Sequence, residues 1–413
     1  MRVQESGILR EDHQTKVAIA GETLVSGGLG HYVTCIDRAL REHAPAGHQI
    51  VTPVIGRHLK ASHSATLRRS PAYRYLAGIA KKVVSRKLWP SADSWAKQWQ
   101  SMPADVMVLL PHVVFNDHGE LDSYYDAIAA RPFVWVIHDL HGYHYPDQWK
   151  PEHLDLMHRR FATLSDRAAH VITQNNFTAN DVTEKLGIPR QRISIGRQPS
   201  LMPSWPKAEK TDAAILADLG LVQPYAIWSS SSTFAHKNHE RLLSAWRLLR
   251  DRGHYINLVC TGSRDPNFAA LQVLCRELGI EEHVRFTGVI EDAQLGVVLR
   301  NAHLAVCPTL FEGGGSGPAT EAVLMGLPLA ASSIPPLREQ FDNRDDICTY
   351  FDPLRPESIA DAVEELLKSY EASKRRAEWA RLELAELQSW RSLADVYWTA
   401  LDTAVFESAA HRG

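Results

Sequence analysis

Two glutamates flank a glycine-rich loop in the stretch "LFEGGGSGPATEAVLMGLPLAASS", residues 310–333. Glu312 stands before the loop, Glu321 follows it, and the small residues between them are Gly313, Gly314, Gly315, Ser316 and Gly317. Pro318 then begins a run of good helix formers that Gly326 can end. A glycine run that leads into a helix exposes backbone N–H groups beside the positive end of the helix dipole. The pattern therefore predicts an anion site suited to a phosphate.

The two carboxylates need another explanation, because a phosphate repels them. Glu321, expected in the first turn of the helix, could accept hydrogen bonds from two vicinal ribose hydroxyls, as acidic residues do in dinucleotide folds. Glu312 would lie nearer to a sugar or would brace the loop. The alternative is that both acids only favour a helix N-terminus. One glycine-rich loop alone leaves that alternative open.

Three further loops carry residues that could act with this one. In "SSSSTFAHKNHERLL" (229–243), Lys237 and a serine run that includes Ser231 can neutralise and hydrogen-bond a diphosphate. The stretch "SGGLGHYV" (26–33) is again glycine-rich and opens a predicted helix, and "VIHDLHGYHYPD" (136–147) places His138 where a strand ends. Three-residue steps from His138 through His141 to His144 are not a usual metal-ligand spacing, so packing or stacking is expected of these rings.

Short apolar runs alternate with helical stretches along the chain and must position these loops. Such continuous runs are typical of parallel strands with both faces covered. They lie at 16–22, 48–55, 105–111, 132–139, 168–174 and 192–196, then at 225–231, 256–262, 284–288, 304–309, 328–333 and 349–351. The proline-rich stretch 197–210 between the two sets reads as a linker.

We therefore expect an α/β chain with two doubly wound, Rossmann-like domains that face each other across a cleft. Residues 1–200 would form the first domain, residues 201–385 the second, and residues 386–413 a helix that packs back on the first. Ligands in such sheets bind at the carboxyl ends of the strands, where the four loops lie.

Composition narrows the class of protein. The chain has 413 residues, 45% of them hydrophobic, and no run of eighteen apolar residues, which is typical of a soluble two-domain protein. Its first residues have mixed charge and no apolar core, so a cytoplasmic location is expected. Five scattered cysteines indicate reduced thiols rather than a disulfide framework or a zinc site. A net charge of -3 argues against a general nucleic-acid binder.

One segment departs from this even charge. Residues 57–90 contain nine Lys or Arg and no Asp or Glu, and apolar residues alternate with the bases in "YRYLAGIAKKVVSRKLW". This composition suits a helix on the inner, anionic face of a membrane, and it equally suits a solvated basic face. Both interpretations stay open.

The order of the motifs resembles retaining glycosyltransferases of family 4, which adopt the GT-B fold. The resemblance covers nearly the whole chain: the first glycine loop, the strand-end His-Asp, "HKNH", "VCTGS", "VRFTGVI", "FEGGGSGPATEA" and "YFDPLRPESIADAVEELL" (350–367). It implies that residues 1–200 form the acceptor-side domain, lined by Gly27, Gly28 and Gly30, and that residues 201–385 form the nucleotide-sugar domain. It assigns catalysis to His138 at the donor sugar, Lys237 at the diphosphate and Glu312 near the sugar. The donor-binding set it implies is Ser231, Lys237, Val289 by the base, Gly314, Gly315, Ser316, Gly317 and Glu321 on the ribose.

Two departures from the family pattern stand out. Eight residues separate Glu312 from Glu321 where seven are usual, and Ser231 occupies a position where many members have arginine. The serine run with "HKNH" is similar to the mannosyl- and rhamnosyl-transferring branch, which favours GDP-mannose as donor. No Asp-x-Asp motif occurs in the chain, so no metal is expected, and the helix dipole, backbone amides and Lys237 would stabilise the leaving diphosphate.

The sequence thus predicts a metal-independent, retaining hexosyltransferase without a cofactor. Its acceptor would be a saccharide, lipid-linked if residues 57–90 meet a membrane, as in surface polysaccharide biosynthesis. The alternatives are a catalytically silent sugar-nucleotide-binding protein, or a transferase that uses a UDP- or dTDP-sugar and a soluble acceptor. A nicotinamide dehydrogenase is disfavoured, because "GGLGHYV" stops short of Gly-x-Gly-x-x-Gly.

Overall fold

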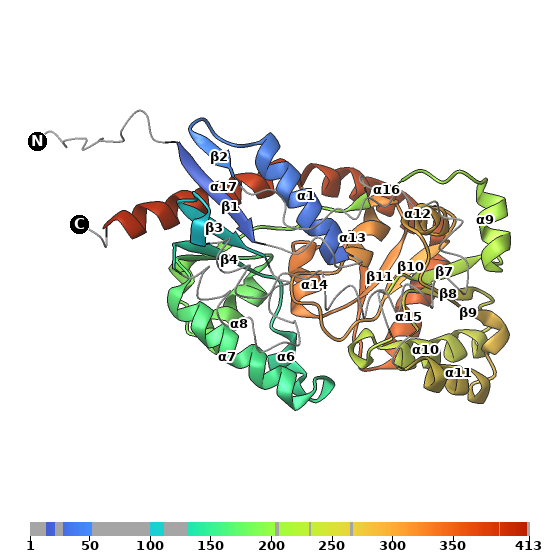
Figure 1. Cartoon of the computed structure of the whole chain (residues 1–413). Coiled ribbons are helices and arrows are strands. Elements are labelled where there is room, and N and C mark those ends of the chain that lie inside the picture. The colour runs from blue at the N-terminus through green and yellow to red at the C-terminus, as the bar shows by residue number, and fades with distance from the viewer. Residues whose placement is uncertain are drawn as a thin grey trace, which may run out of the picture.

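Two parallel β-sheets, each covered by helices, make up the computed structural model of the chain (Figure 1). The structure describes residues 14–20, 28–51, 100–110, 130–202, 206–230, 233–264, 267–387 and 389–410. The basic segment 57–90 lies outside these residues. No helix in the described residues is long and apolar enough to cross a membrane.

The N-terminal sheet has the strand order β2-β1-β3-β4-β5-β6, all parallel. Its strands are β1 (Thr15–Ala20), β2 (His48–Ile50), β3 (Val106–Leu109), β4 (Phe133–Ile137), β5 (His170–Thr173) and β6 (Ile193–Ile195). Side chains that alternate along β1 enter two different cores, with Val17 and Ile19 on one face and Ala18 and Ala20 on the other.

Helices α7 (Pro151–Arg167) and α8 (Asn176–Leu186) cover one face of this sheet, and α1 (Gly28–Glu42) and α17 (Trp390–Ala410) cover the other. The C-terminal helix α17 therefore lies on the sheet formed by the first half of the chain (Figure 1). The hydroxyl groups of Tyr32 and Tyr397 are 2.5 Å apart between α1 and α17. Gly196, just after β6, leaves room for Leu393, because a Cβ there would lie 2.7 Å from the leucine Cδ1.

The C-terminal sheet has the order β12-β11-β10-β7-β8-β9, also parallel. Read from β9, this is the 3-2-1-4-5-6 order of dinucleotide-binding folds, with the reversal of direction between β7 and β10. The strands are β7 (Tyr225–Trp228), β8 (Asn257–Thr261), β9 (Val284–Gly288), β10 (Leu304–Cys307), β11 (Leu329–Ser332) and β12 (Thr349–Phe351).

Eight helices in the described residues accompany this sheet: α9 (Asp212–Leu219), α10 (His239–Asp251), α11 (Phe268–Glu277), α12 (Asp292–Arg300), α13 (Gly317–Leu324), α14 (Pro335–Gln340), α15 (Pro356–Lys368) and α16 (Tyr370–Leu387). Shorter helical segments are α6 (His141–His144), η3 (Pro146–Gln148), η4 (Arg190–Arg192), η6 (Ala235–Lys237) and η7 (Glu281–His283).

Each of the twelve apolar runs coincides with one strand to within a residue or contains it, so the predicted α/β architecture of two doubly wound sheets is confirmed. The runs were informative because central parallel strands are buried on both faces, as the fully buried β3, β4 and β10 show. The described parts of the predicted linker, 197–202 and 206–210, contain no α-helix or strand.

Candidate functional site

An ion pair stands where the direction of the C-terminal sheet reverses. Lys237 follows β7 and Glu312 follows β10, the two strands at the switch point, where ligands of such sheets bind. Lys237 Nζ lies 2.7 Å from Glu312 Oε1, and each side chain is 14% exposed. The structure thus brings together two predicted catalytic residues that are 75 positions apart.

The glycine loop after Glu312 touches the N-terminal half of the chain. The carbonyl of Gly313 accepts hydrogen bonds from Asn175 Nδ2 at 2.7 Å and Thr178 Oγ1 at 2.9 Å. A Cβ at Gly313 would overlap Asp139 Cβ and lie 2.7 Å from the carbonyl oxygen of His138. A glycine is therefore needed at position 313 so that the opposite domain can pack against the loop. The sequence-based prediction explained the glycines by phosphate access and did not include this packing.

Three other positions of the loop are occupied by glycine for different structural reasons. A Cβ at Gly314 would overlap the side-chain amide of Gln174. Gly315 has a φ of +99°, which side-chain-bearing residues rarely adopt. Gly317 has open space around its missing Cβ, with no atom nearer than Glu321 Oε1 at 3.9 Å. Of the loop's glycines, Gly317 best fits the expected role of leaving room for a ligand.

Ser316 ends the loop as the N-cap of α13. Its hydroxyl accepts from the Ala319 amide at 3.4 Å, and its own amide donates to Gln340 Oε1 at 2.7 Å. Gln340 also donates to the Ser316 carbonyl at 2.9 Å, so it braces the loop from both sides. Pro318 lies in the first turn and Gly326 has a φ of +65° after the helix, as predicted. Glu321 is the fifth residue of α13, which corrects its predicted place in the first turn.

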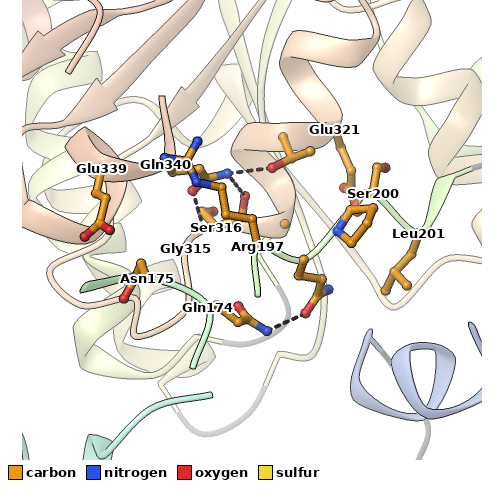
Figure 2. Close-up of a pocket in the computed structure, with 15 residues that line it drawn as sticks. Gln174, Asn175, Arg197, Ser200, Leu201, Gly315, Ser316, Glu321, Glu339 and Gln340 are labelled. Carbon is orange, nitrogen blue, oxygen red and sulfur yellow. Dashed lines mark hydrogen bonds between the residues drawn. The ribbon is translucent and has the colours of Figure 1, made fainter. Parts of the chain in front are cut away.

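A cavity opens beside this loop between the two halves of the chain, and Figure 2 shows its lining. Its enclosed volume is about 70 Å³, well under the roughly 300–1,000 Å³ of sites for drug-sized ligands. As it stands, the cavity has room for one small part of a nucleotide. Its lining includes Gln174, Asn175 and Arg197 from the first half and Gly314, Gly315, Ser316, Gly317, Glu321, Glu339 and Gln340 from the second.

Glu321 is the carboxylate in this lining with the most perturbed titration. Burial, together with the nearby negative charge of Asp292, raises the pKa of Glu321 to about 7. Within the described residues its carboxylate accepts no hydrogen bond. Its oxygens can therefore accept hydrogen bonds from the hydroxyl groups of a ligand. Asp292 begins α12, three residues after Val289, so the loop that carries Val289 lies near Glu321.

Histidines and aromatic rings join the two halves on the other side of the ion pair. His236 Nδ1 lies 3.2 Å from His141 Nε2 and 3.0 Å from Gln148 Oε1. Trp149 Nε1 donates to His141 Nδ1 at 3.0 Å. Burial, then the charge of Lys237, lowers the pKa of His236 to about 3, so its ring is neutral at neutral pH.

The predicted packing role of the histidines after β4 agrees with these contacts. His138 meets the ring of Tyr32 edge-on, with centroids 4.6 Å apart, and His144 Nε2 lies 2.5 Å from Asp181 Oδ2. The three rings thus turn to different partners. Among the described residues, no cluster of three or more His, Cys, Asp or Glu side chains could hold a metal ion.

Several predicted residues cannot be placed in this site. Gly27 and Ser231 lie outside the described residues. Gly28 and Gly30 stand in the first turn of α1, on the N-terminal sheet. Val289 follows β9 and is 78% exposed, so in this structure it contacts little of the protein.

Sequence reasoning missed the residues that connect the two halves. Arg197 follows β6 and lies 2.5 Å from Asp342 Oδ1, and Glu339 accepts from the Asn176 amide at 2.6 Å. One sequence feature could have pointed to Arg197, namely a cation shortly after a predicted strand. No sequence feature pointed to Asn175 and Thr178, because their partner Gly313 is more than 130 positions away.

Comparison with known proteins gives a family match within the second half of the chain. Residues 216–383 match the family described as "Glycosyl transferases group 1". We call these residues the group 1 domain. The group 1 domain holds Lys237, Glu312, the glycine loop and Glu321, and thus every described member of the predicted donor-binding set.

Two curated relatives each match about half of the chain. The chain is 30% identical over 194 residues to the MMP α-(1->4)-mannosyltransferase of Mycolicibacterium hassiacum, which covers 47% of this chain and 45% of the relative. It is 20% identical over 210 residues to the O-antigen chain mannosyltransferase RfbU of Salmonella typhimurium, covering 50% and 54%. The chain therefore spans about half the length of the curated relatives it matches.

Solved structures extend the likeness to both halves. The Anabaena protein Alr3699/HepE in complex with UDP and glucose superposes with a TM-score of 0.67 at 13% identity, over 94% of this chain and 100% of that one. At this identity the likeness shows the fold alone. The chain has the GT-B fold, as predicted.

Proposed function

We propose that this protein is a metal-independent, retaining glycosyltransferase that moves a hexose from a nucleotide-diphosphate sugar to a saccharide acceptor. The observation that carries the proposal is the grouping of Lys237, Glu312 and the glycine loop at the switch point of the group 1 domain. Lys237 would stabilise the negative charge that builds on the leaving diphosphate. The N-terminus of α13 would add its dipole and the amides of the loop.

The resemblance to family 4 supplies the proposed roles of the other residues. Glu321 would accept hydrogen bonds from the ribose hydroxyls, and the exposed Val289 would meet the base once it binds. Glu312, held by Lys237, would lie near the sugar as it gains oxocarbenium character. Retention would follow a front-face route in which the leaving phosphate accepts the acceptor's proton. His138 would contact the donor sugar, and Gly28 and Gly30 would lie on the acceptor side.

Mannose is the favoured sugar and GDP-mannose the favoured donor. Both curated relatives reported above are named mannosyltransferases, and "HKNH" points to the same branch. A lipid-linked acceptor in surface polysaccharide biosynthesis fits the basic segment 57–90 and would bring the protein to the inner face of a membrane as a peripheral protein.

A donor panel tests this proposal. Thermal unfolding with GDP-, UDP-, dTDP- and ADP-sugars should show the largest rise in Tm with GDP-mannose, because a ligand that binds only the native state stabilises it. A larger rise with a UDP- or dTDP-sugar would replace the proposed donor. Tight binding without transfer to any saccharide acceptor would favour the silent sugar-nucleotide-binding alternative.

The metal-independent mechanism predicts that transfer survives excess EDTA. Lys237 and the helix N-terminus would supply the charge stabilisation that Mg²⁺ or Mn²⁺ supplies elsewhere. Turnover and the anomeric configuration of the product, followed by NMR, check this expectation. Loss of turnover in EDTA with recovery on adding Mg²⁺ would contradict it, and an inverted product would contradict retention.

A further inference from the structure

Two buried donors of the N-terminal domain hold the carbonyl of Gly313, the residue that follows Glu312. Asn175 is 4% exposed and Thr178 is fully buried, and both donate to the carbonyl of Gly313, at 2.7 and 2.9 Å. They come from the N-cap and the first turn of α8, on the opposite side of the cleft from the glycine loop. We call Asn175, Thr178 and Gly313 the clasp.

The clasp is part of a contact made from both directions. Glu339, on α14 of the group 1 domain, accepts from the amides of Asn176 at 2.6 Å and Phe177 at 3.2 Å. These amides are the otherwise unpaired donors at the start of α8. The first turn of α8 therefore gives two hydrogen bonds to the glycine loop and receives its own charge-assisted cap from the same domain.

The position of the clasp determines what it can fix. The Gly313 carbonyl belongs to the planar peptide unit of Gly313 and Gly314, and two backbone torsions at Gly313 connect that unit to the peptide unit of Glu312 and Gly313. Gly313 itself is packed against Asp139 and the His138 carbonyl, so holding its carbonyl restricts the backbone directly after the glutamate. On the other side of Glu312, Phe311 is 7% exposed and packs near His144, with centroids 5.0 Å apart. The Glu312 backbone is thus held by the opposite domain before and after the residue.

We propose that Asn175 and Thr178 are positioning residues for Glu312, which they hold at Lys237 when the two domains are in contact. The proposal rests on the proposed function, because it assigns the clasp to the transfer step. Thr178 does not line the cavity. The residues proposed to bind the nucleotide, which are Lys237, Glu321 and the glycine loop, all belong to the group 1 domain. Loss of the Thr178 hydroxyl should therefore lower turnover and leave nucleotide binding nearly unchanged.

The test compares three variants of helix α8. Thr178→Val keeps the shape of the side chain and removes the hydroxyl, and Thr178→Ser restores the hydroxyl. Thr183→Val is the matched control, because the Thr183 hydroxyl bonds only to the Ala179 carbonyl of its own helix, at 3.1 Å. We expect kcat to fall about tenfold in Thr178→Val, as for one lost hydrogen bond, and to recover within about threefold in Thr178→Ser. The Kd of GDP, measured by calorimetry, should change by less than about twofold.

Asn175→Asp gives an independent second variant. A carboxylate keeps the N-cap acceptor for the Thr178 amide, which now bonds to Asn175 Oδ1 at 2.9 Å, and loses the donor to Gly313. This variant should also lower kcat, and its Tm should fall because the new carboxylate oxygen faces the Gly313 carbonyl oxygen at a buried position. Equal kcat in Thr178→Val and Thr183→Val would overturn the proposal. A loss of nucleotide affinity that matches the loss of turnover would also overturn it, because it would make these binding residues.

Hydrogen exchange separates this proposal from the proposed function. If the wild type transfers no sugar from any donor, the proposed function fails, and exchange of the segment 309–317 still reports on the clasp. Faster exchange there in Thr178→Val than in Thr183→Val would support a clasp that orders the loop. Identical exchange in the two variants would overturn it.

Discussion

At the scale of single residues, the ion pair would keep Lys237 charged and in place for a diphosphate while the site is empty. Lys237 and Glu312 are mostly buried, and each would suffer a desolvation penalty without the other. An arriving diphosphate would compete for the same ammonium group and release part of its hold on Glu312. The carboxylate would then be available near the sugar at the stage when positive charge develops there.

Lys237→Ala should weaken binding of GDP and of GDP-mannose alike. The loss should be about 1.5–3 kcal/mol for a charge-assisted bond, or roughly 10- to 150-fold in Kd by calorimetry. Lys210→Ala is the matched control, because Lys210 makes an exposed pair with Asp218 at 2.6 Å and should leave both Kd values unchanged. Wild-type affinity in Lys237→Ala would remove this lysine from the donor site.

Glu321 gives the protein a pH dependence whose sign can be worked out. Its pKa is about 7 in the folded protein and near 4.5 in the unfolded chain, so the folded state binds the proton more tightly. Stability from this group is complete below about pH 4.5 and is lost as pH rises through 7. Glu321→Gln stays neutral, so the free energy of unfolding of this variant relative to the wild type should rise by about 1–3 kcal/mol from pH 5 to pH 8.

Urea titrations at several pH values measure this difference, and Asp292→Asn is an informative companion. Removing the charge of Asp292 should lower the pKa of Glu321 and weaken the pH dependence without abolishing it, because burial is the larger cause. Binding of GDP to the wild type should strengthen between pH 6 and 8, since ribose hydroxyls donate to the ionised carboxylate. Parallel stability curves for the wild type and Glu321→Gln would contradict the raised pKa.

At the scale of elements, the strands could be predicted and the contacts between domains could not. A buried parallel strand can be predicted from its continuous apolar run, and the helix after the glycine loop can be predicted from Pro318 and Gly326. The contact of Gly313 with Asp139 has no such local pattern, because only the fold brings the two residues together. The sequence therefore predicted a glycine loop at this place and explained it by phosphate access, which stays a prediction, and it did not predict the packing at Gly313 and Gly314.

Substitutions at two loop glycines separate these causes. A Cβ at Gly313 overlaps Asp139, so Gly313→Ala should force the loop and the N-terminal domain apart and lower stability by about 1–3 kcal/mol. Gly317→Ala meets open space at an ordinary φ and should leave the Tm unchanged. If the amides near Gly317 bind phosphate, the second variant should nevertheless weaken GDP binding. Equal Tm values for the two variants would contradict the packing argument.

At the scale of the whole molecule, the site depends on two domains in contact. The group 1 domain supplies Lys237, Glu312 and Glu321, and the N-terminal domain supplies the donors and rings that meet its loops. The C-terminal helix α17 adds a second link, since it continues the group 1 half of the chain and packs in the core of the first sheet. A change in the N-terminal domain can therefore affect the residues of the other domain that are proposed to bind the donor.

The last prediction concerns the acceptor and the basic segment 57–90, known from the sequence alone. Nine bases without an acid should attract anionic headgroups by roughly 1 kcal/mol for each residue near the surface. Wild-type protein should sediment with vesicles that contain phosphatidylserine or phosphatidylglycerol and remain in solution with neutral vesicles. Added salt should release it, because the attraction is screened within about 8–10 Å at physiological ionic strength.

Two sets of four substitutions to Gln make this test specific. Changing Lys81, Lys82, Arg86 and Lys87 should release the protein from anionic vesicles and leave GDP binding intact. The matched set removes the same charge from exposed positions of the group 1 half: Lys207, Lys210, Arg276 and Lys368. If the two sets weaken vesicle binding equally, total charge and not the segment is responsible. If the wild type ignores anionic vesicles, the segment is a solvated basic face, and a soluble saccharide becomes the favoured acceptor.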